Sequence, residues 1–257
     1  GPEITYENGK VYLYYTGHKE GGSLCIAAAV ADKPEGPYRD LGPLMCEADG
    51  SIDAFPVRDE KGKLYMIWKE DGNSKGKPTP IWAQEMKEDR GGLLGTKKEL
   101  FRADTPWEKG LVEGVSIIRR QGYFYAFYAA AACCGKTCSY GTGVARAKNL
   151  LGPWEKYPGN PVLADNENWK CPGHGTPVEK DGRFYYLYHG YSTASGAYGG
   201  RQGLLSEFKF TADSFITFGW LTPDIRRTSR ANLFKSSLSV EVQIFIAIIS
   251  LVVRSRT

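Results

Sequence analysis

The chain has 257 residues, of which 42% are hydrophobic, 13% aromatic and 24% charged, with a formal net charge of +4. This composition is typical of a globular protein with a sizeable core. The small net charge and the absence of a Lys/Arg block before residue 226 argue against a nucleic-acid partner. The chain opens at Gly1-Pro2 with no initiator Met and no signal-peptide pattern, so we expect the true start to be missing or processed.

A short aromatic motif occurs four times along the chain. In each copy a glycine is followed three residues later by Tyr and six residues later by Tyr or Trp. The copies begin at Gly9, Gly62, Gly122 and Gly182, about sixty residues apart. Each glycine completes a dipeptide typical of a tight turn, and the run after it alternates as a strand does. We therefore predict four β-hairpins within a repeated structural unit.

Further strands are predicted around these hairpins. Runs typical of a first strand precede three of the turns, at residues 54–58, 115–119 and 176–179. Runs typical of a third strand follow, at residues 24–30, 81–86, 143–147 and 203–210. Two spacers, Gly36-Pro37-Tyr38 and Gly152-Pro153-Trp154, separate one unit from the next.

This pattern predicts an all-β fold with radial repetition, a β-propeller. We expect blades near residues 1–45, 46–105, 106–165 and 166–215. A linear β-solenoid is the alternative, but its repeats are usually shorter than sixty residues.

The pattern stops near residue 216, and residues 216–257 form a tail of unassigned structure. An apolar run from residue 242 to 253 is shorter than the about 20 residues that a membrane-spanning helix needs. We expect a terminal strand or a buried helix there, and no membrane partner.

Six cysteines are present, and three of them lie close together in Cys133-Cys134-x3-Cys138. This spacing indicates a disulfide in a loop, with Cys171 as a candidate partner; reduced, buried thiols are the alternative. A zinc site formed with His174 is disfavoured because paired CxxC units are missing.

Three polar residues lie at nearly the same distance before successive hairpin turns. Asp53 and Glu113 each lie nine residues before the turn glycine, and His174 lies eight before it. The first strand of a propeller blade lines the central channel, so we expect the three side chains to face one pocket. A pair of carboxylates in a cleft suits proton transfer, and glycoside hydrolysis depends on such pairs. The alternative is that each carboxylate only caps a strand or binds backbone amides.

Five signals occur together in order: Gly1-Pro-Glu3-Ile4, Ser51-Ile-Asp53, Val112-Glu113-Gly114, Gly173-His174-Gly175 and the Gly-Pro-Tyr/Trp spacers. With them, residues 1–215 resemble the family 43 glycoside hydrolases. The resemblance implies a five-bladed propeller, of which about four blades are present here. It also implies cleavage of α-L-arabinofuranosyl or β-D-xylosyl linkages in plant polysaccharides, with inversion at the anomeric carbon.

The resemblance also implies roles for single residues. Glu113 is the general acid, and Asp53 is the second carboxylate, which raises the pKa of the acid and orients it. His174 matches a channel histidine that joins a calcium or water cluster in some members; a hydrogen-bonded histidine without metal is the alternative. Arg201 is placed to reach the substrate; the alternative is a solvated surface arginine. Phe55 is placed to line the sugar pocket; the alternative is that it belongs to the core. No cofactor is required, and a structural calcium ion is the only candidate.

One departure from the family pattern stands out. The family's general base is an aspartate on the blade before the Pro-Glu-Ile motif, where this chain begins, so we expect the base to be missing. Glu3 is not in a base motif and is not assigned that role. A non-catalytic glycan-binding propeller or an inactive fragment is therefore the alternative function. An extracellular or periplasmic location is expected because plant polysaccharides lie outside the cytoplasm; the oligomeric state is not predicted.

Overall fold

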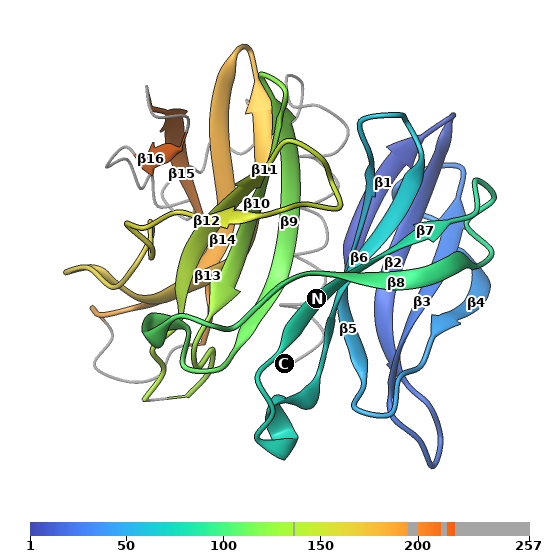
Figure 1. Cartoon of the computed structure of the whole chain (residues 1–257), viewed down its shortest axis with the longest axis horizontal. Coiled ribbons are helices and arrows are strands. Elements are labelled where there is room, and N and C mark those ends of the chain that lie inside the picture. Colours follow the sequence, from blue (N-terminus) through green and yellow to red (C-terminus); the bar gives the residue numbers. More distant parts are fainter. Residues whose placement is uncertain (136, 195–199, 212–214, 219–257) are drawn as a thin grey trace.

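The computed structural model describes residues 1–135, 137–194, 200–211 and 215–218. These residues form four antiparallel sheets, each with four strands in chain order (Figure 1). In Figure 1 the first two sheets, blue to green, lie on one side of the molecule and the last two on the other. The predicted all-β propeller is confirmed, with four blades.

The strands of the first blade are β1 (Glu3–Glu7), β2 (Lys10–His18), β3 (Leu24–Ala31) and β4 (Arg39–Met45). Those of the second are β5 (Ser51–Arg58), β6 (Leu64–Glu70), β7 (Pro80–Met86) and β8 (Leu93–Arg102). Those of the third are β9 (Val112–Arg120), β10 (Tyr123–Ala130), β11 (Gly141–Ala147) and β12 (Glu155–Lys156). Those of the fourth are β13 (Trp169–Lys180), β14 (Arg183–Ser192), β15 (Gln202–Phe210) and β16 (Ile216–Phe218). Two short 3-10 helices, η1 (Gly72–Lys75) and η2 (Pro106–Glu108), lie in the connections.

The predicted hairpin turns join the first and second strands of the blades. At Asn8-Gly9, Gln121-Gly122 and Asp181-Gly182 both residues have positive φ. A two-residue turn of this kind matches the twist of the flanking strands, and Asn-Gly and Asp-Gly tolerate it best. The local sequence therefore determines these hairpins.

Apolar side chains pack the blades against one another. Between the second and third blades the cluster includes Ile67 and Tyr128, and between the third and fourth it includes Phe127 and Tyr186. The rings of Phe127 and Tyr186 are stacked with their centroids 5.1 Å apart. This packing brings the first strands together, so that β5 contacts β1 and β9, and β9 contacts β13.

All six cysteines form disulfides, so the alternative of reduced thiols is wrong. The pairs are Cys25–Cys46, Cys133–Cys134 and Cys138–Cys171. The predicted loop disulfide to Cys171 is confirmed, and its partner is Cys138.

The apolar run at residues 242–253 lies outside the described residues, as does nearly all of the predicted tail. Within the part of the chain that the structure describes, no helix is long and apolar enough to span a membrane.

Candidate active site

The structure brings Asp53, Glu113 and His174 together from three neighbouring blades. The backbone N–H of Gly114 donates to Asp53 Oδ2 at 3.1 Å, so Asp53 on β5 reaches the residue directly after Glu113 on β9. His174 Nε2 on β13 lies 3.9 Å from Asp53 Oδ1. Both carboxylates are buried. The predicted convergence of the three side chains at one place is therefore present.

Each of the three inner strands is irregular at this level. The pairing register shifts near Asp53 in β5, near Gly114 in β9 and near His174 in β13. The three residues have φ values of 56°, 58° and 48°. A bulge changes the direction of a side chain relative to the sheet. For a non-glycine residue a left-handed conformation costs about 1 to 3 kcal/mol, and such strain is concentrated at functional sites.

The Asp53 carboxylate accepts more than one hydrogen bond within the site. Besides the Gly114 N–H, its carboxylate accepts a hydrogen bond from the backbone nitrogen of Gly1, at 2.6 Å. Burial alone would raise the pKa of Asp53, but the nearby His174 and Lys69 act in the opposite direction, and this pKa lies below its usual range. Asp53 is therefore ionised at neutral pH.

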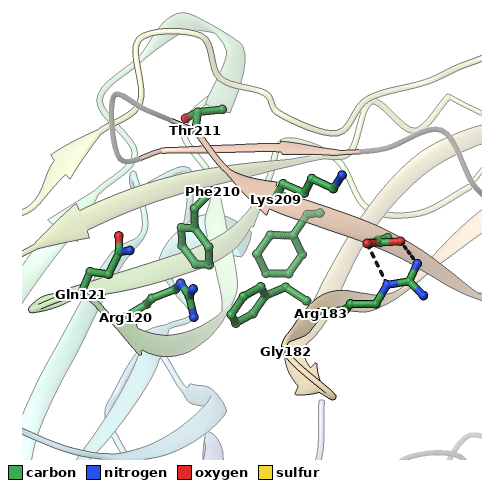
Figure 2. A pocket seen from close by; sticks show the side chains of 10 residues that line it. Arg120, Gln121, Gly182, Arg183, Lys209, Phe210 and Thr211 are labelled. Carbon is green, nitrogen blue, oxygen red and sulfur yellow. Dashed lines mark hydrogen bonds and ion pairs between the residues drawn. The ribbon is translucent and has the colours of Figure 1, made fainter.

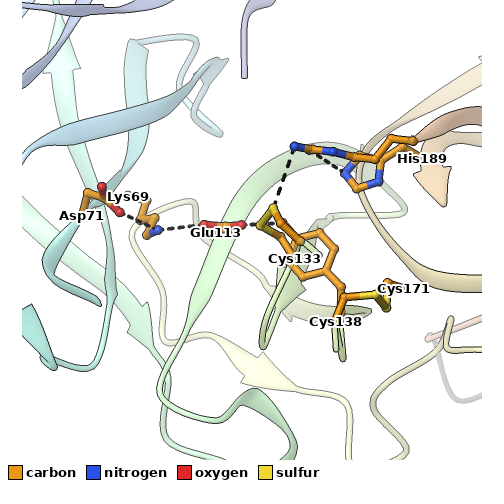
Figure 3. The surroundings of a disulfide bond; sticks show 10 residues. Lys69, Asp71, Glu113, Cys133, Cys138, Cys171 and His189 are labelled. Carbon is orange, nitrogen blue, oxygen red and sulfur yellow. Dashed lines mark hydrogen bonds and ion pairs between the residues drawn. A yellow bond between two sulfur atoms is a disulfide. The ribbon is translucent and has the colours of Figure 1, made fainter. Parts of the chain in front are cut away.

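Glu113 is held through both of its carboxyl oxygens (Figure 3). Lys69 Nζ donates to Oε2 at 2.7 Å, and the Tyr140 hydroxyl donates to Oε1 at 2.6 Å. Lys69 is only 1% exposed and also pairs with Asp71 Oδ1, at 2.8 Å. Glu113 thus accepts from one donor on its own blade and one on the second blade.

The two donors keep their protons at neutral pH. Burial lowers the pKa of Lys69, but Glu113 and Asp71 outweigh it, so that this pKa is raised. Burial, followed by the charge of Glu113 and its hydrogen bond, raises the pKa of Tyr140 well above its ordinary value. A cation and a neutral hydroxyl therefore face the Glu113 carboxylate.

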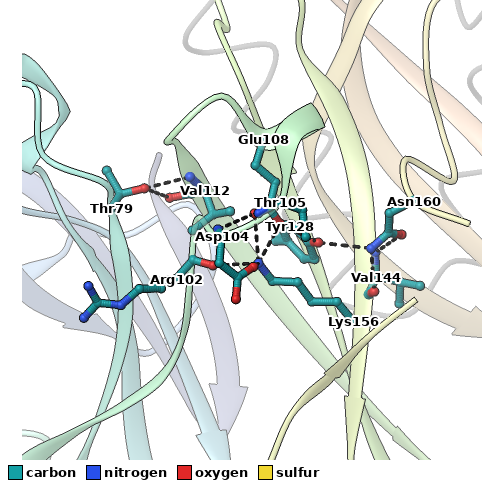
Figure 4. Close-up of polar contacts among 10 residues, drawn as sticks. All are labelled: Thr79, Arg102, Asp104, Thr105, Glu108, Val112, Tyr128, Val144, Lys156 and Asn160. Carbon is teal, nitrogen blue, oxygen red and sulfur yellow. Dashed lines mark hydrogen bonds and ion pairs between the residues drawn. The ribbon is translucent and has the colours of Figure 1, made fainter. Parts of the chain in front are cut away.

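The entry to the strand that carries Glu113 is anchored from two sides (Figure 4). The Thr79 hydroxyl donates to the Val112 carbonyl and accepts from the Val112 N–H. In the preceding turn the fully buried Glu108 accepts from the Tyr128 hydroxyl at 2.9 Å and pairs with Lys156 at 2.7 Å. These contacts hold the backbone immediately before Glu113.

A second histidine lies beside the site. The His189 ring on β14 is stacked on Tyr140, with centroids 5.9 Å apart, and its centroid is 6.4 Å from that of His174. Burial, with smaller contributions from His174 and Arg201, lowers the pKa of His189 to about 3. His189 is therefore neutral, and its Nε2 can accept from Arg201 Nη1 at 3.4 Å.

The other predicted substrate residues occupy different surroundings. Arg201 is exposed and lies next to His189 and to Cys134, whose Sγ is 3.8 Å from Arg201 Nη2. Phe55 is half-buried and packs against the apolar cluster between the second and third blades. Substrate contact by Arg201 and Phe55 stays a prediction.

Three residues of the site were missed by the sequence analysis: Lys69, Tyr140 and His189. Lys69 is a charged residue that directly follows the apolar run at residues 64–68, and His189 directly follows the last aromatic motif. These positions could have indicated that Lys69 and His189 lie at the buried end of a strand. Tyr140 had none beyond its position two residues after Cys138.

The site does not fit a calcium ion held by the described side chains. Ca²⁺ takes six to eight oxygen ligands. Among the described residues, no group of three or more His, Cys, Asp or Glu side chains is placed to hold a metal. A metal at His174 therefore stays an expectation from the resemblance, and no chemistry is assigned to it.

A cavity lies away from the carboxylates. It has a volume of about 520 Å³ and lies at the turns that join β9 to β10 and β13 to β14 (Figure 2). Arg120, Arg183 and Phe210 are among its lining residues. Glu113 lies at the opposite end of β9, and His174 lies near the middle of β13.

Comparison with known proteins identifies the class to which this fold and site belong. The model of the family described as glycosyl hydrolases family 43 matches residues 1–216. The chain belongs to this family.

Two curated relatives and one solved structure illustrate the similarity. A xylan 1,3-beta-xylosidase of a Vibrio species is 29% identical over 201 residues, which cover 73% of this chain and 36% of the relative. The extracellular endo-alpha-(1->5)-L-arabinanase 1 of Bacillus subtilis is 25% identical over 185 residues, which cover 67% of this chain and 55% of the relative. The crystal structure of a thermostable family-43 glycoside hydrolase superposes with a TM-score of 0.77 at 29% identity, covering 86% of this chain and 74% of that one. The chain spans about a third of the length of the first curated relatives it matches.

Proposed function

We propose that the protein hydrolyses O-glycosidic bonds of arabinose- or xylose-containing plant polysaccharides with inversion. Glu113 is the general acid, and Asp53 is the carboxylate that sets its protonation and orients it. The observation that carries this proposal is the juxtaposition of the two groups, with Asp53 bonded to the backbone N–H directly after Glu113. The names of the xylosidase and arabinanase relatives support the substrate class. An extracellular or periplasmic location is part of the same proposal.

In this mechanism Glu113 gives a proton to the oxygen of the leaving sugar. Negative charge then develops on its carboxylate, where Lys69 and Tyr140 already donate hydrogen bonds. Donors that are in place before the reaction stabilise such charge without reorganisation. Asp53 accepts from the backbone N–H of Gly114, directly after Glu113, and in this proposal it orients the strand segment that carries the acid.

The general base is not assigned to a described residue. Inversion needs a second carboxylate about 6.5 to 9.5 Å from the acid, with room for water. Burial raises the pKa of Glu3 to about 8, outweighing its hydrogen bond from the Ile4 N–H. Glu3 is therefore mostly protonated at neutral pH and is unsuited to activate water.

Because no described residue is assigned as the general base, we consider a second candidate function: a propeller that binds glycans without cleaving them. The two functions differ in product release: a binding module retains xylan or arabinan fragments and liberates no sugar. Incubation with these fragments, followed by chromatography of released sugars, separates them.

The general-acid role is tested with Glu113→Gln in the full-length protein. General acid catalysis contributes about 10² to 10⁴ in rate, so we expect kcat on aryl glycosides to fall by that factor while sugar binding is kept. Glu99→Gln, at a partly exposed carboxylate on β8 that pairs with Arg102, is the matched control. Unchanged turnover by the Glu113→Gln variant would remove the proposal.

A further inference from the structure

We infer that Tyr140 is a positioning residue for Glu113, and that the Cys138–Cys171 disulfide holds Tyr140 in place, so that hydrolysis depends on the oxidation state of this disulfide. The inference rests on the proposed general-acid role of Glu113. It adds a residue and a covalent bond that the sequence motifs do not include.

Tyr140 binds the carboxyl oxygen of Glu113 that Lys69 does not bind. Lys69 binds Oε2 from the second blade, and the Tyr140 hydroxyl binds Oε1 from the residue just before β11. Tyr140 is only 2% exposed, and its ring is stacked on His189. With a donor on each oxygen, the carboxyl group is restrained from rotating about its terminal torsion.

The disulfide joins the segment that carries Tyr140 to the next blade (Figure 3). Cys138 lies two residues before Tyr140, in the connection between β10 and β11, and Cys171 is fully buried in β13. The backbone N–H of Cys171 donates to Asp165 Oδ1 at 2.6 Å, so this end of the tether is anchored.

The connection between β10 and β11 lies largely at the surface. Its described residues between positions 132 and 139 are half-buried or exposed. A small cluster of Ala129, Tyr140, Cys171 and Tyr191, with Cys133 and Cys138 against it, supplies its apolar contacts. Because two of these contacts come from the bonded cysteines, cleavage of the bond is expected to loosen the position of Tyr140.

The redox step is a thiol–disulfide exchange. A dithiol reductant attacks the Cys138–Cys171 bond, the Sγ–Sγ bond breaks, and two electrons and two protons end on the two cysteine thiols while the reductant becomes its own disulfide. The adjacent pair Cys133–Cys134 can also be reduced, but it joins neighbouring residues and ties no two blades together. Variants are therefore needed to separate the two.

The first test uses Tyr140→Phe in the full-length protein, with one aryl glycoside that has a poor leaving group and one that has a good one. A hydrogen bond to a charged group contributes enough for a change of about 10-fold to 100-fold. We expect kcat to fall by that factor for the poor leaving group and much less for the good one, with KM unchanged. Tyr188→Phe, which removes a buried hydroxyl bonded to Ser206 at 3.0 Å, is the control. A kcat within about twofold of wild type for both substrates would overturn the role of Tyr140.

The second test uses the double variant Cys138→Ser/Cys171→Ser. We expect the same leaving-group-dependent loss, and no further loss when Tyr140→Phe is added, because the two changes act through one hydrogen bond. Cys25→Ser/Cys46→Ser, which removes the disulfide of the first blade, is the control. Additive losses would show that the disulfide does not act through Tyr140. If the double variant does not fold, treatment of the wild type with a dithiol and reoxidation replaces it, and kcat should fall and return.

A third measurement needs no activity. In protein labelled with ¹³C-tyrosine, the Tyr140 signal is assigned by its loss in Tyr140→Phe. This signal should not titrate near the ordinary tyrosine pKa of about 10 in the wild type, because burial and Glu113 raise the pKa of Tyr140, but it should titrate closer to that value in Cys138→Ser/Cys171→Ser. A Tyr140 signal that stays silent in that variant would overturn the tether. Failure of the proposed general-acid role can be told apart from failure of the tether. In the first case the Glu113→Gln variant keeps its turnover, regardless of the results for the Tyr140 and cysteine variants.

Discussion

Asp53 and Gly114 are joined by a hydrogen bond of 3.1 Å between the second and third blades, from the Gly114 N–H to Asp53 Oδ2. Asp53 has φ 56° and Gly114 has φ 58°, so both ends of this bond lie at left-handed backbone positions. The bond places an ionised carboxylate beside the backbone of Glu113. The surroundings of this contact can be tested by substitution and by pH.

Gly114→Ala should destabilise the protein and displace His174. A Cβ atom at Gly114 would lie 2.9 Å from the His174 ring, in addition to the strain of a left-handed alanine, about 1 to 3 kcal/mol. Gly122→Ala is the matched control, since Gly122 has φ 80° but nothing within 4 Å of its Cβ position. Urea unfolding measures both. Equal losses of unfolding free energy would show that the His174 contact contributes nothing.

Lys69→Met should destabilise the protein strongly, because it leaves Glu113 and Asp71 without their shared, buried cation. Removing one partner of a buried ion pair costs about 3 to 5 kcal/mol. Lys63→Met, at an exposed pair with Glu85, should change stability little. Adding Glu113→Gln to Lys69→Met should recover part of the loss in unfolding free energy. A double variant that is less stable than the sum of the two single changes would contradict the pairing.

Glu108→Gln should weaken the anchor of the strand that carries Glu113. The change removes the buried charge opposite Lys156 and disturbs the hydrogen bonds from Asp104, Thr105 and Tyr128. We expect a loss of about 3 kcal/mol in thermal or urea unfolding. Glu155→Gln, at an exposed pair with Arg146, is the control and should have little effect. Equal effects at the two positions would show that Glu108 is not a structural anchor.

His189 should make the folded state less stable in acid. Its pKa is about 3 in the folded protein and about 6.5 when unfolded, so between these values the unfolded chain binds the extra proton. The stabilisation is therefore complete above about pH 6.5 and is lost as the pH falls toward 3, at no more than about 1.4 kcal/mol per pH unit. We expect His189→Gln to show a shallower fall in unfolding free energy over this window than wild type. Parallel curves for the two proteins would contradict the low pKa of His189.

Much of the site could be predicted because the position of each site residue along its strand is set by the nearby hairpin turn. The turn dipeptides and alternating aromatic runs determine each hairpin, and the equal offsets of Asp53 and Glu113 from their turn glycines determine which end of each strand they occupy. Once the blades are arranged around one centre, equal offsets in neighbouring strands bring the side chains together. His174 follows the same rule with an offset one residue shorter.

Tertiary structure alone decided which groups surround these residues. Lys69 and Tyr140 meet Glu113 from 44 and 27 residues away along the chain. The choice of Cys138 rather than Cys133 or Cys134 as the partner of Cys171 depends on how the third and fourth blades pack. Sequence patterns report which face of a strand is buried, but contacts between blades depend on the packing of whole sheets. That packing is the sum of many weak apolar contacts, and no single motif encodes it.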